Sequence, residues 1–215
     1  MLVIAFDTAT PAVTVALHDG RGVVGRQEAV DARRHGELLA PAIEAALTGA
    51  GGTPADLTAV AVGVGPGPYT GLRAGLVTAR VFGSTLGIPV HGVCTLDVIA
   101  AQASVSAGGE FIVATDARRR EVYWARYAAD GERLSGPLVS PPSELPRGYP
   151  VAGQGPRLYA GLGEVIEPEF PDAARLAEIA VDRIARGLPA APAQALYLRR
   201  PDAREPGRPK RVTPA

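Results

Sequence analysis

Two short segments carry side chains that could act on a ligand. The first is Asp7-Thr8-Ala9-Thr10, where a carboxylate and two hydroxyls follow a run of apolar residues. At the end of a strand, Asp7 could hold a metal ion or a water molecule, and Thr8 could bind a phosphate. Asp and Thr also satisfy the free amides of tight turns, so a purely structural role is the alternative.

The second segment is the loop at residues 63–71, Gly-Val-Gly-Pro-Gly-Pro-Tyr-Thr-Gly, which precedes a predicted helix. Glycines allow close backbone approach and a helix N-terminus offers free N–H groups to an anion, so Gly65 and Gly67 are candidates for phosphate contact. The loop lacks the Gly-Lys-Ser/Thr ending of a P-loop and the glycine spacing of a dinucleotide site. Pro66 and Pro68 also remove two amides. A rigid connection between strand and helix explains the loop equally well.

The histidines, the cysteine and the lysine restrict the chemistry further. His18, His35 and His91 are scattered, with no carboxylate or second histidine at ligand spacing, so the sequence predicts no metal site. Cys94 is the only cysteine, which excludes an intramolecular disulfide. Lys210 is the only lysine, which argues against a phosphate-loop or Schiff-base lysine. We expect no bound cofactor.

Composition gives the class of protein. The chain has 215 residues, with 22 Lys and Arg against 22 Asp and Glu, so no overall field recruits nucleic acid or an anionic membrane. The hydrophobic fraction of 47% is that of a globular protein. No apolar run approaches the roughly 20 residues of a spanning helix, and the N-terminus lacks the features of a signal peptide. We therefore expect no membrane contact and a cytoplasmic location.

Hydrophobic periodicity predicts the elements that must position these segments. The predicted strands cover residues 2–7, 12–17, 23–30, 57–64, 90–93, 111–116 and 121–127. The predicted helices cover residues 37–47, 72–86, 95–103 and 173–186. The Pro- and Ser-rich stretch at residues 134–149 is predicted to be loop.

The second half of the chain opens as the first does, with a strand that ends in an aspartate (Asp116), a turn and a second strand. This partial echo predicts an α/β protein of two related lobes, at residues 1–106 and 107–198. Residues 199–215 form a Pro- and Arg-rich tail with six basic and two acidic residues, a net charge of +4. Such a tail is either solvated chain or a contact for RNA phosphates.

The predicted helix at residues 72–86 is apolar over much of its circumference. One stripe contains Leu72, Leu76, Ala79, Phe82, Gly83 and Leu86, and a second flank contains Val77, Val81 and Thr85. Such a helix is either deeply buried or docks a partner as well as its own sheet, and in so small a lobe we expect a partner. The predicted interface consists of Leu39, Ile43, Leu47, Leu72, Leu76, Ala79, Phe82, Gly83 and Leu86. Leu76→Glu or Phe82→Glu is then expected to abolish pairing.

Four motifs together resemble the TsaB family, the non-catalytic partners in bacterial biosynthesis of the tRNA nucleoside threonylcarbamoyladenosine (t6A). They are Asp7-Thr8-Ala9-Thr10, the loop at residues 63–71 extended by x-Arg73-x-Gly75, Gly92-Val93-x-Thr95-Leu96-Asp97, and Asp116-Ala117-Arg118-x-x-Glu121-Val122-Tyr123. Tyr197-Leu198-Arg199 matches the ending of the family, so the resemblance runs from residue 2 to about residue 200.

The resemblance implies two ribonuclease-H-like lobes of the actin-like ATPase (ASKHA) fold. It also implies a scaffold that binds and activates a TsaD-like catalytic paralogue through helices of the first lobe, with a TsaE-like ATPase joining the assembly. The paralogue transfers threonylcarbamoyl to the adenosine 3′ of the anticodon, so this chain is expected to contact tRNA through the complex. The sequence leaves open whether the chain forms a homodimer without the partner.

The chain departs from the pattern of the catalytic paralogue at two places. The paralogue has a His-x-x-x-His metal pair, whereas here Thr95 follows His91 at that spacing. Gly153-Gln154-Gly155 also lacks the Gly-Gly and the downstream Asn of the paralogue's nucleotide motif, and the chain contains no Asn. We therefore expect no catalytic residue. The alternatives are an ATP-dependent phosphotransferase or metal-dependent hydrolase that uses Asp7, and an RNA-binding protein that uses the tail.

Overall fold

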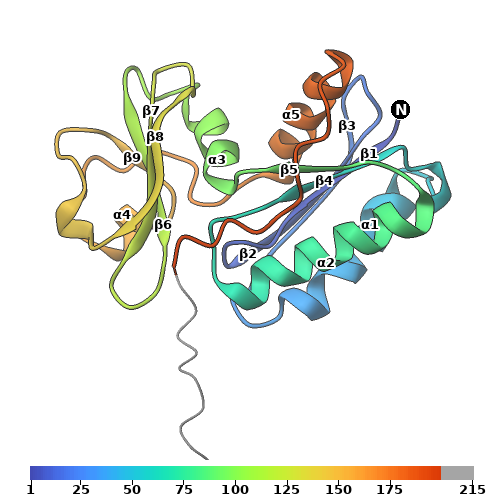
Figure 1. Cartoon of the computed structure of the whole chain (residues 1–215), viewed down its shortest axis with the longest axis horizontal. Helices are drawn as coiled ribbons and strands as arrows, with labels where there is room; N and C mark the ends of the chain where they lie inside the picture. Colours follow the sequence, from blue (N-terminus) through green and yellow to red (C-terminus); the bar gives the residue numbers. More distant parts are fainter. Residues whose placement is uncertain (200–215) are drawn as a thin grey trace, which may run out of the picture.

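The structure is a computed structural model that describes residues 1–199, and it consists of two lobes, each built on one β-sheet (Figure 1). The first sheet has the strand order β3-β2-β1-β4-β5. Its strands are β1 (Val3–Asp7), β2 (Ala12–His18), β3 (Val23–Val30), β4 (Ala59–Gly63) and β5 (Val90–Val93). The first three strands form an antiparallel meander, and β4 and β5 extend the sheet in parallel to β1.

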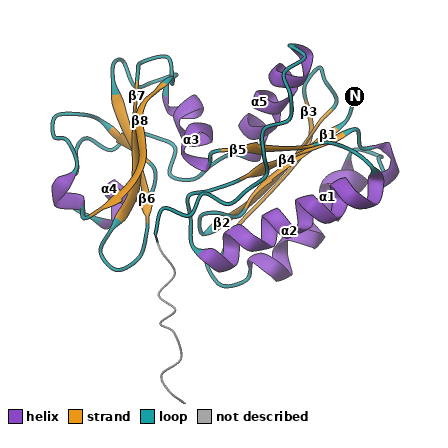
Figure 2. Ribbon diagram, in the orientation of Figure 1, coloured by secondary structure: helices purple, strands orange, loops and turns teal. Residues whose placement is uncertain are grey.

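Helices cover both faces of the first sheet (Figure 2). Helices α1 (His35–Gly49) and α2 (Tyr69–Leu86) lie on one face, and α5 (Ala173–Ala185) lies on the other. Successive side chains of a strand point to opposite faces. In β1, Ile4 and Phe6 accordingly pack with α1 and α2, and Val3 and Ala5 pack with α5. This two-sided burial explains why β1 and β4 are almost uninterrupted apolar runs.

The second sheet has the strand order β8-β7-β6-β9, with β6 (Phe111–Asp116), β7 (Val122–Tyr127), β8 (Arg133–Ser140) and β9 (Val151–Ala152). Helix α3 (Thr95–Ala103) covers the face toward the first lobe (Figure 1). The other face is covered by the segment from the 3-10 turn Pro142–Glu144 through α4 (Gly155–Leu158) to Leu162. Another 3-10 turn, Pro54–Asp56, precedes β4.

The predicted elements are confirmed with small shifts at their ends, apart from the stretch at residues 134–149. The prediction of loop is wrong there for β8, which pairs with β7 in antiparallel orientation. Gly136 and Pro137 hid this strand, because both residues are rare inside strands. Gly136 has φ +92°, and the pairing register shifts beside it. Because β8 is an edge strand, the missing N–H of Pro137 is tolerated.

The two lobes do not follow the predicted division at residues 106 and 107. Helix α3 precedes that point but packs on the second sheet, and α5 follows it but packs on the first. The chain then returns along the first lobe, where the Gly92 N–H donates to the Ala191 carbonyl and the Leu196 N–H donates to the Val64 carbonyl. Of the predicted tail, residues 200–215 lie outside the described part. Within residues 1–199, no helix is long and apolar enough to cross a membrane.

Candidate partner-docking face and the buried Asp7 cluster

Asp7 lies at the C-terminal end of β1 and is completely buried. Its Oδ1 accepts the Ala9 N–H at 2.7 Å, and its Oδ2 accepts the Thr95 hydroxyl at 2.7 Å. Burial raises the pKa of this carboxyl, and these hydrogen bonds oppose the rise. A Cβ atom on Gly63 would lie 1.8 Å from Asp7 Oδ2, so the neighbouring strand approaches as closely as only glycine permits.

Hydrogen bonds and close packing also connect Thr8 and its neighbour Ala9 to the glycine-rich loop and the start of α2. The Thr8 hydroxyl donates to the Gly71 carbonyl at 2.7 Å and accepts the Gly75 N–H at 3.1 Å. A Cβ on Gly67 would lie 2.2 Å from the Ala9 carbonyl oxygen, so the loop packs directly on the end of β1.

The four residues predicted to contact a nucleotide or phosphate are thus buried. They are Asp7, Thr8, Gly65 and Gly67. The N–H of Gly65 donates to the Thr95 hydroxyl at 3.1 Å, which completes a closed set of hydrogen bonds. Side chains whose oxygens already bind the backbone have little capacity left for a ligand. The structural alternative therefore describes these residues, and a ligand contact has no support from their geometry.

The surroundings of His91 and Thr95 decide whether a metal ion fits. Thr95 stands where the catalytic paralogue would offer its second histidine, and its hydroxyl is already engaged with Asp7 and Gly65. The Nδ1 atom of His91 is buried without a hydrogen-bond partner, and burial lowers the pKa of the ring. No group of three or more His, Cys, Asp or Glu residues converges within residues 1–199. A lone neutral imidazole is a poor metal site, so these residues do not fit an ion.

The predicted partner interface needs a correction. Six of its nine residues are buried in the core of their own lobe: Leu39, Ile43, Leu47, Leu72, Leu76 and Ala79. Their spacing turns them toward the first sheet, so a partner cannot touch them. Phe82, Gly83 and Leu86 are half-buried and remain accessible in part. Leu76→Glu would consequently place a charge in the core and report on folding, not on pairing.

The second flank of α2 is the exposed one. Val77 and Val81 are 59% and 56% exposed, although both are large apolar side chains. We call one strip of this flank the α2 ridge; it consists of Ala74, Val77, Thr78, Val81 and Thr85, of which Ala74 and Thr78 are half-buried. These five residues are uncharged, and the exposed Arg73 and Arg80 lie along one side of the ridge. A small apolar groove beside it, with a volume of about 150 Å³, is lined by Pro54, Val81, Phe82, Thr85 and Leu86.

Both arginines of α2 bind the C-terminal segment. Arg73 Nε donates to the Tyr197 hydroxyl at 3.2 Å, and Arg80 donates to the Ala193 carbonyl at 3.1 Å. The ring of Tyr197 also stacks on that of Tyr69, with 4.7 Å between centroids. We call residues 190–199 the C-terminal strap. The Pro-rich sequence gave no periodic signal for these contacts, so sequence reasoning missed the strap.

Comparisons with known proteins show the family to which the chain belongs. The profile of the family described as "TsaD: tRNA N6-adenosine threonylcarbamoyltransferase" matches residues 15–195. An uncharacterized protein of Mycobacterium tuberculosis is 49% identical over 207 residues, which cover 94% of this chain and 93% of that protein. The chain belongs to the TsaD/TsaB family.

Further relatives identify the branch within this family. The "tRNA threonylcarbamoyladenosine biosynthesis protein TsaB" of Escherichia coli is 37% identical over 131 residues, which cover 60% of this chain and 56% of that protein. The solved structure of YeaZ from Pseudomonas aeruginosa superimposes with a TM-score of 0.75 at 29% identity, covering 92% of this chain and 99% of that one. The resemblance to TsaB is thereby confirmed, as is the expected actin-like α/β fold of two lobes.

Proposed function

We propose that this chain is the scaffold subunit of the t6A machinery: it binds a TsaD-like catalytic subunit, activates it, and performs no chemistry itself. The observation that carries the proposal is the α2 ridge, on which two valines are more than half exposed. Large apolar side chains gathered on one helix face of a small lobe are typical of a surface that another protein covers.

The Asp7 cluster supports the non-catalytic part of the proposal. In a related enzyme, the ends of these strands would hold the reacting groups. Here the carboxylate is sealed by Gly63 and hydrogen-bonded to Ala9 and Thr95. A group that serves as general base or metal ligand must reach its substrate or ion, and this one is fully buried.

The α2 ridge is suited to a helix of similar kind. Its small and β-branched side chains let a second helix approach closely, and the groove beside Phe82 and Leu86 offers a place for one protruding apolar residue. A stable interface of this type buries roughly 1,200–2,000 Å² in total, so we expect neighbouring parts of α1 to contribute. The same ridge would pair two copies of the chain when the catalytic partner is absent. A TsaE-like ATPase would join the pair, and because the substrate is tRNA we expect the assembly in the cytoplasm.

The decisive test is the substitution of the two exposed valines. Val81→Glu, alone or with Val77→Glu, should weaken binding to the TsaD-like subunit at least tenfold, because the interface would bury an unpaired charge. Isothermal titration calorimetry measures the affinity, and circular dichroism verifies the fold. The tRNA-modifying activity of the reconstituted pair should fall in parallel.

Val105→Glu is the matched control, since Val105 is 87% exposed and lies after α3, away from the ridge. Equal loss of binding in this variant, or full binding in Val81→Glu, would refute the docking face. Modification of tRNA by the chain without its partner would refute the scaffold role.

A further inference from the structure

The turn between β6 and β7 consists of three consecutive arginines in an uncommon conformation. Arg118, Arg119 and Arg120 have φ angles of +62°, +56° and +61°. For residues with a Cβ atom this left-handed conformation costs about 1–2 kcal/mol each. Single residues adopt it in many proteins, but three in a row require that the surrounding structure hold them.

Several contacts hold this turn. Asp116 Oδ1 accepts the Arg118 N–H at 2.8 Å, and Asp116 Oδ2 forms an ion pair with the Arg118 guanidinium at 3.3 Å. The Ala117 N–H and the Glu121 carbonyl close the base of the turn at 3.0 Å. Arg199 of the strap donates to the Ala117 carbonyl at 3.3 Å and also forms an ion pair with Glu121. The result is a fixed backbone that presents arginine side chains outward.

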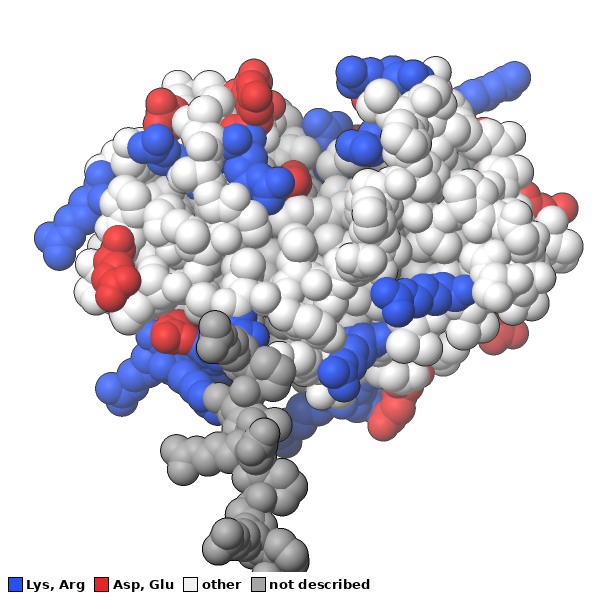
Figure 3. Space-filling model, viewed as in Figure 1, with Lys and Arg blue, Asp and Glu red and all other residues white. Residues whose placement is uncertain are grey.

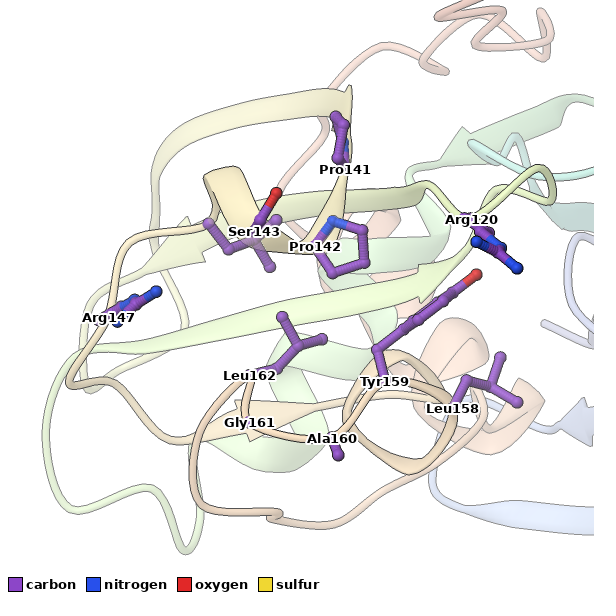
Figure 4. Close-up of a pocket in the computed structure, with 11 residues that line it drawn as sticks. Arg120, Pro141, Pro142, Ser143, Arg147, Leu158, Tyr159, Ala160, Gly161 and Leu162 are labelled. Carbon is purple, nitrogen blue, oxygen red and sulfur yellow. The ribbon is translucent and has the colours of Figure 1, made fainter.

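A pocket lies beside this turn on the second lobe (Figure 4). Its volume is about 610 Å³, and its lining includes Arg120, Pro142, Ser143, Arg147, Tyr159 and Leu162. Arg120 lies next to the hydroxyl end of Tyr159 at one end of the pocket, and Arg147 lies at the other end, with Pro142 and Leu162 between them. Among residues 1–199, no carboxylate belongs to the lining. The site therefore combines two cations, a half-buried aromatic ring and an apolar floor.

We propose that this pocket binds a nucleotide unit of an RNA strand, with the base against Tyr159 and the apolar floor and the flanking phosphates on Arg120 and Arg147. The inference rests on the proposed function, which gives the complex an RNA substrate. Base stacking on aromatic rings together with arginine–phosphate pairs is the general mode of single-strand recognition.

The positions of the two arginines favour a strand over a free nucleotide. A mononucleotide carries its phosphates at one end, whereas a unit within a strand has a phosphate on each side of its base. Charge around the pocket agrees: basic side chains gather along the lower edge of the second lobe (Figure 3), where Figure 1 places the β6–β7 turn. Arg199, which contacts this turn, is followed in the sequence by five basic and two acidic residues.

The test uses the double variant Arg120→Ala/Arg147→Ala of the full chain, alone and in complex with the TsaD-like subunit. Fluorescence anisotropy with labelled tRNA should show binding about tenfold weaker than for the unaltered protein. The slope of log Kd against log salt should fall by about two, one for each lost phosphate contact. Tyr159→Ala should weaken binding at constant slope, and Tyr159→Phe should not, because stacking is retained.

The matched control is Arg21→Ala/Arg186→Ala, which removes two exposed arginines of the first lobe and should leave both quantities unchanged. An unchanged salt slope in the pocket variant would overturn the proposal. The proposal would also be overturned if the pocket variant lost binding of AMP or ATP but still bound tRNA, because the pocket would then be a site for a free nucleotide. Affinity for the catalytic subunit is measured on the same variants and should not change. If the unaltered protein did not bind the catalytic subunit at all, the scaffold role would be refuted. The anisotropy measured with the chain alone would still report on RNA binding by the pocket.

Discussion

At the scale of single residues, the Asp7 cluster shows how a motif that resembles a ligand site can serve the fold. The carboxylate joins the end of β1 to the start of α3 through Thr95, and Gly63 makes room for it. The sequence singled out Asp7 and Thr8, and separately Gly65 and Gly67, as candidate ligand contacts. It could not decide between a ligand and a structural role, because the decision depends on burial and on which oxygens are already hydrogen-bonded.

Gly63→Ala should be among the most destabilising single changes in the chain. The new methyl group would overlap Asp7 Oδ2, and we expect the free energy of unfolding to fall by about 3 kcal/mol. Gly49→Ala is the matched control, since nothing lies within 4 Å of a Cβ at the last position of α1. That change should leave stability unaltered or raise it by up to about 1 kcal/mol. Urea denaturation measures both, and similar losses would contradict the packing described for β4.

Asp7→Asn should change how stability depends on pH. The pKa of Asp7 is raised in the folded state, mainly by burial. A group of this kind contributes stability below its unfolded pKa, near 3.8, and that contribution is lost as pH rises through the higher folded pKa. Asparagine does not titrate, so the variant should gain stability relative to the unaltered chain between pH 4 and pH 7. A difference in unfolding free energy that stays constant over this range would show that the pKa is not raised.

At the scale of elements, α2 shows what periodicity can and cannot determine. The pattern predicted a helix with two apolar flanks, and both exist. The flank chosen for the partner faces the sheet instead, because the longer side chains Leu72 and Leu76 fill the core and the shorter Val77 and Val81 remain outside. To choose between two apolar flanks, one must know where the sheet lies, and the sequence of the helix alone does not give that position. Strand β8 was missed for a local reason, its Gly136-Pro137 pair.

The C-terminal strap is an element without regular structure, and its removal should be measurable. A chain that ends at residue 189 loses two backbone hydrogen bonds to the first sheet and the burial of Leu196, which packs against the cores of both lobes. These losses sum to about 3 kcal/mol, which lowers the midpoint of thermal unfolding by about 10 °C. Differential scanning calorimetry tests this against a chain that ends at Arg199, and equal midpoints would show that the strap adds no stability.

At the scale of the whole molecule, the sequence indicated two related lobes but not how they share the chain. The echo of a strand, an aspartate and a turn at Asp7 and Asp116 predicted the two sheets correctly. The sequence did not predict that α3 packs on the second sheet and α5 on the first. An amphipathic helix fits either sheet, and proximity along the chain favours the nearer one. Polar contacts within the second lobe hold α3 on its sheet: Tyr127 donates to Asp97 of α3 at 2.8 Å, and Arg133 lies 3.6 Å from the same carboxylate.

The placement of α5 affects how the protein is made. One side of the first sheet, with Val3, Ala5 and Ala61, is covered by Leu176 and Ala180, which are synthesised more than a hundred residues later. Until α5 has been synthesised, the apolar side of these early strands therefore lacks the helix that covers it in the folded protein. Native closure of the first lobe has to wait until α5 has been synthesised, and until then this apolar face can take part in aggregation.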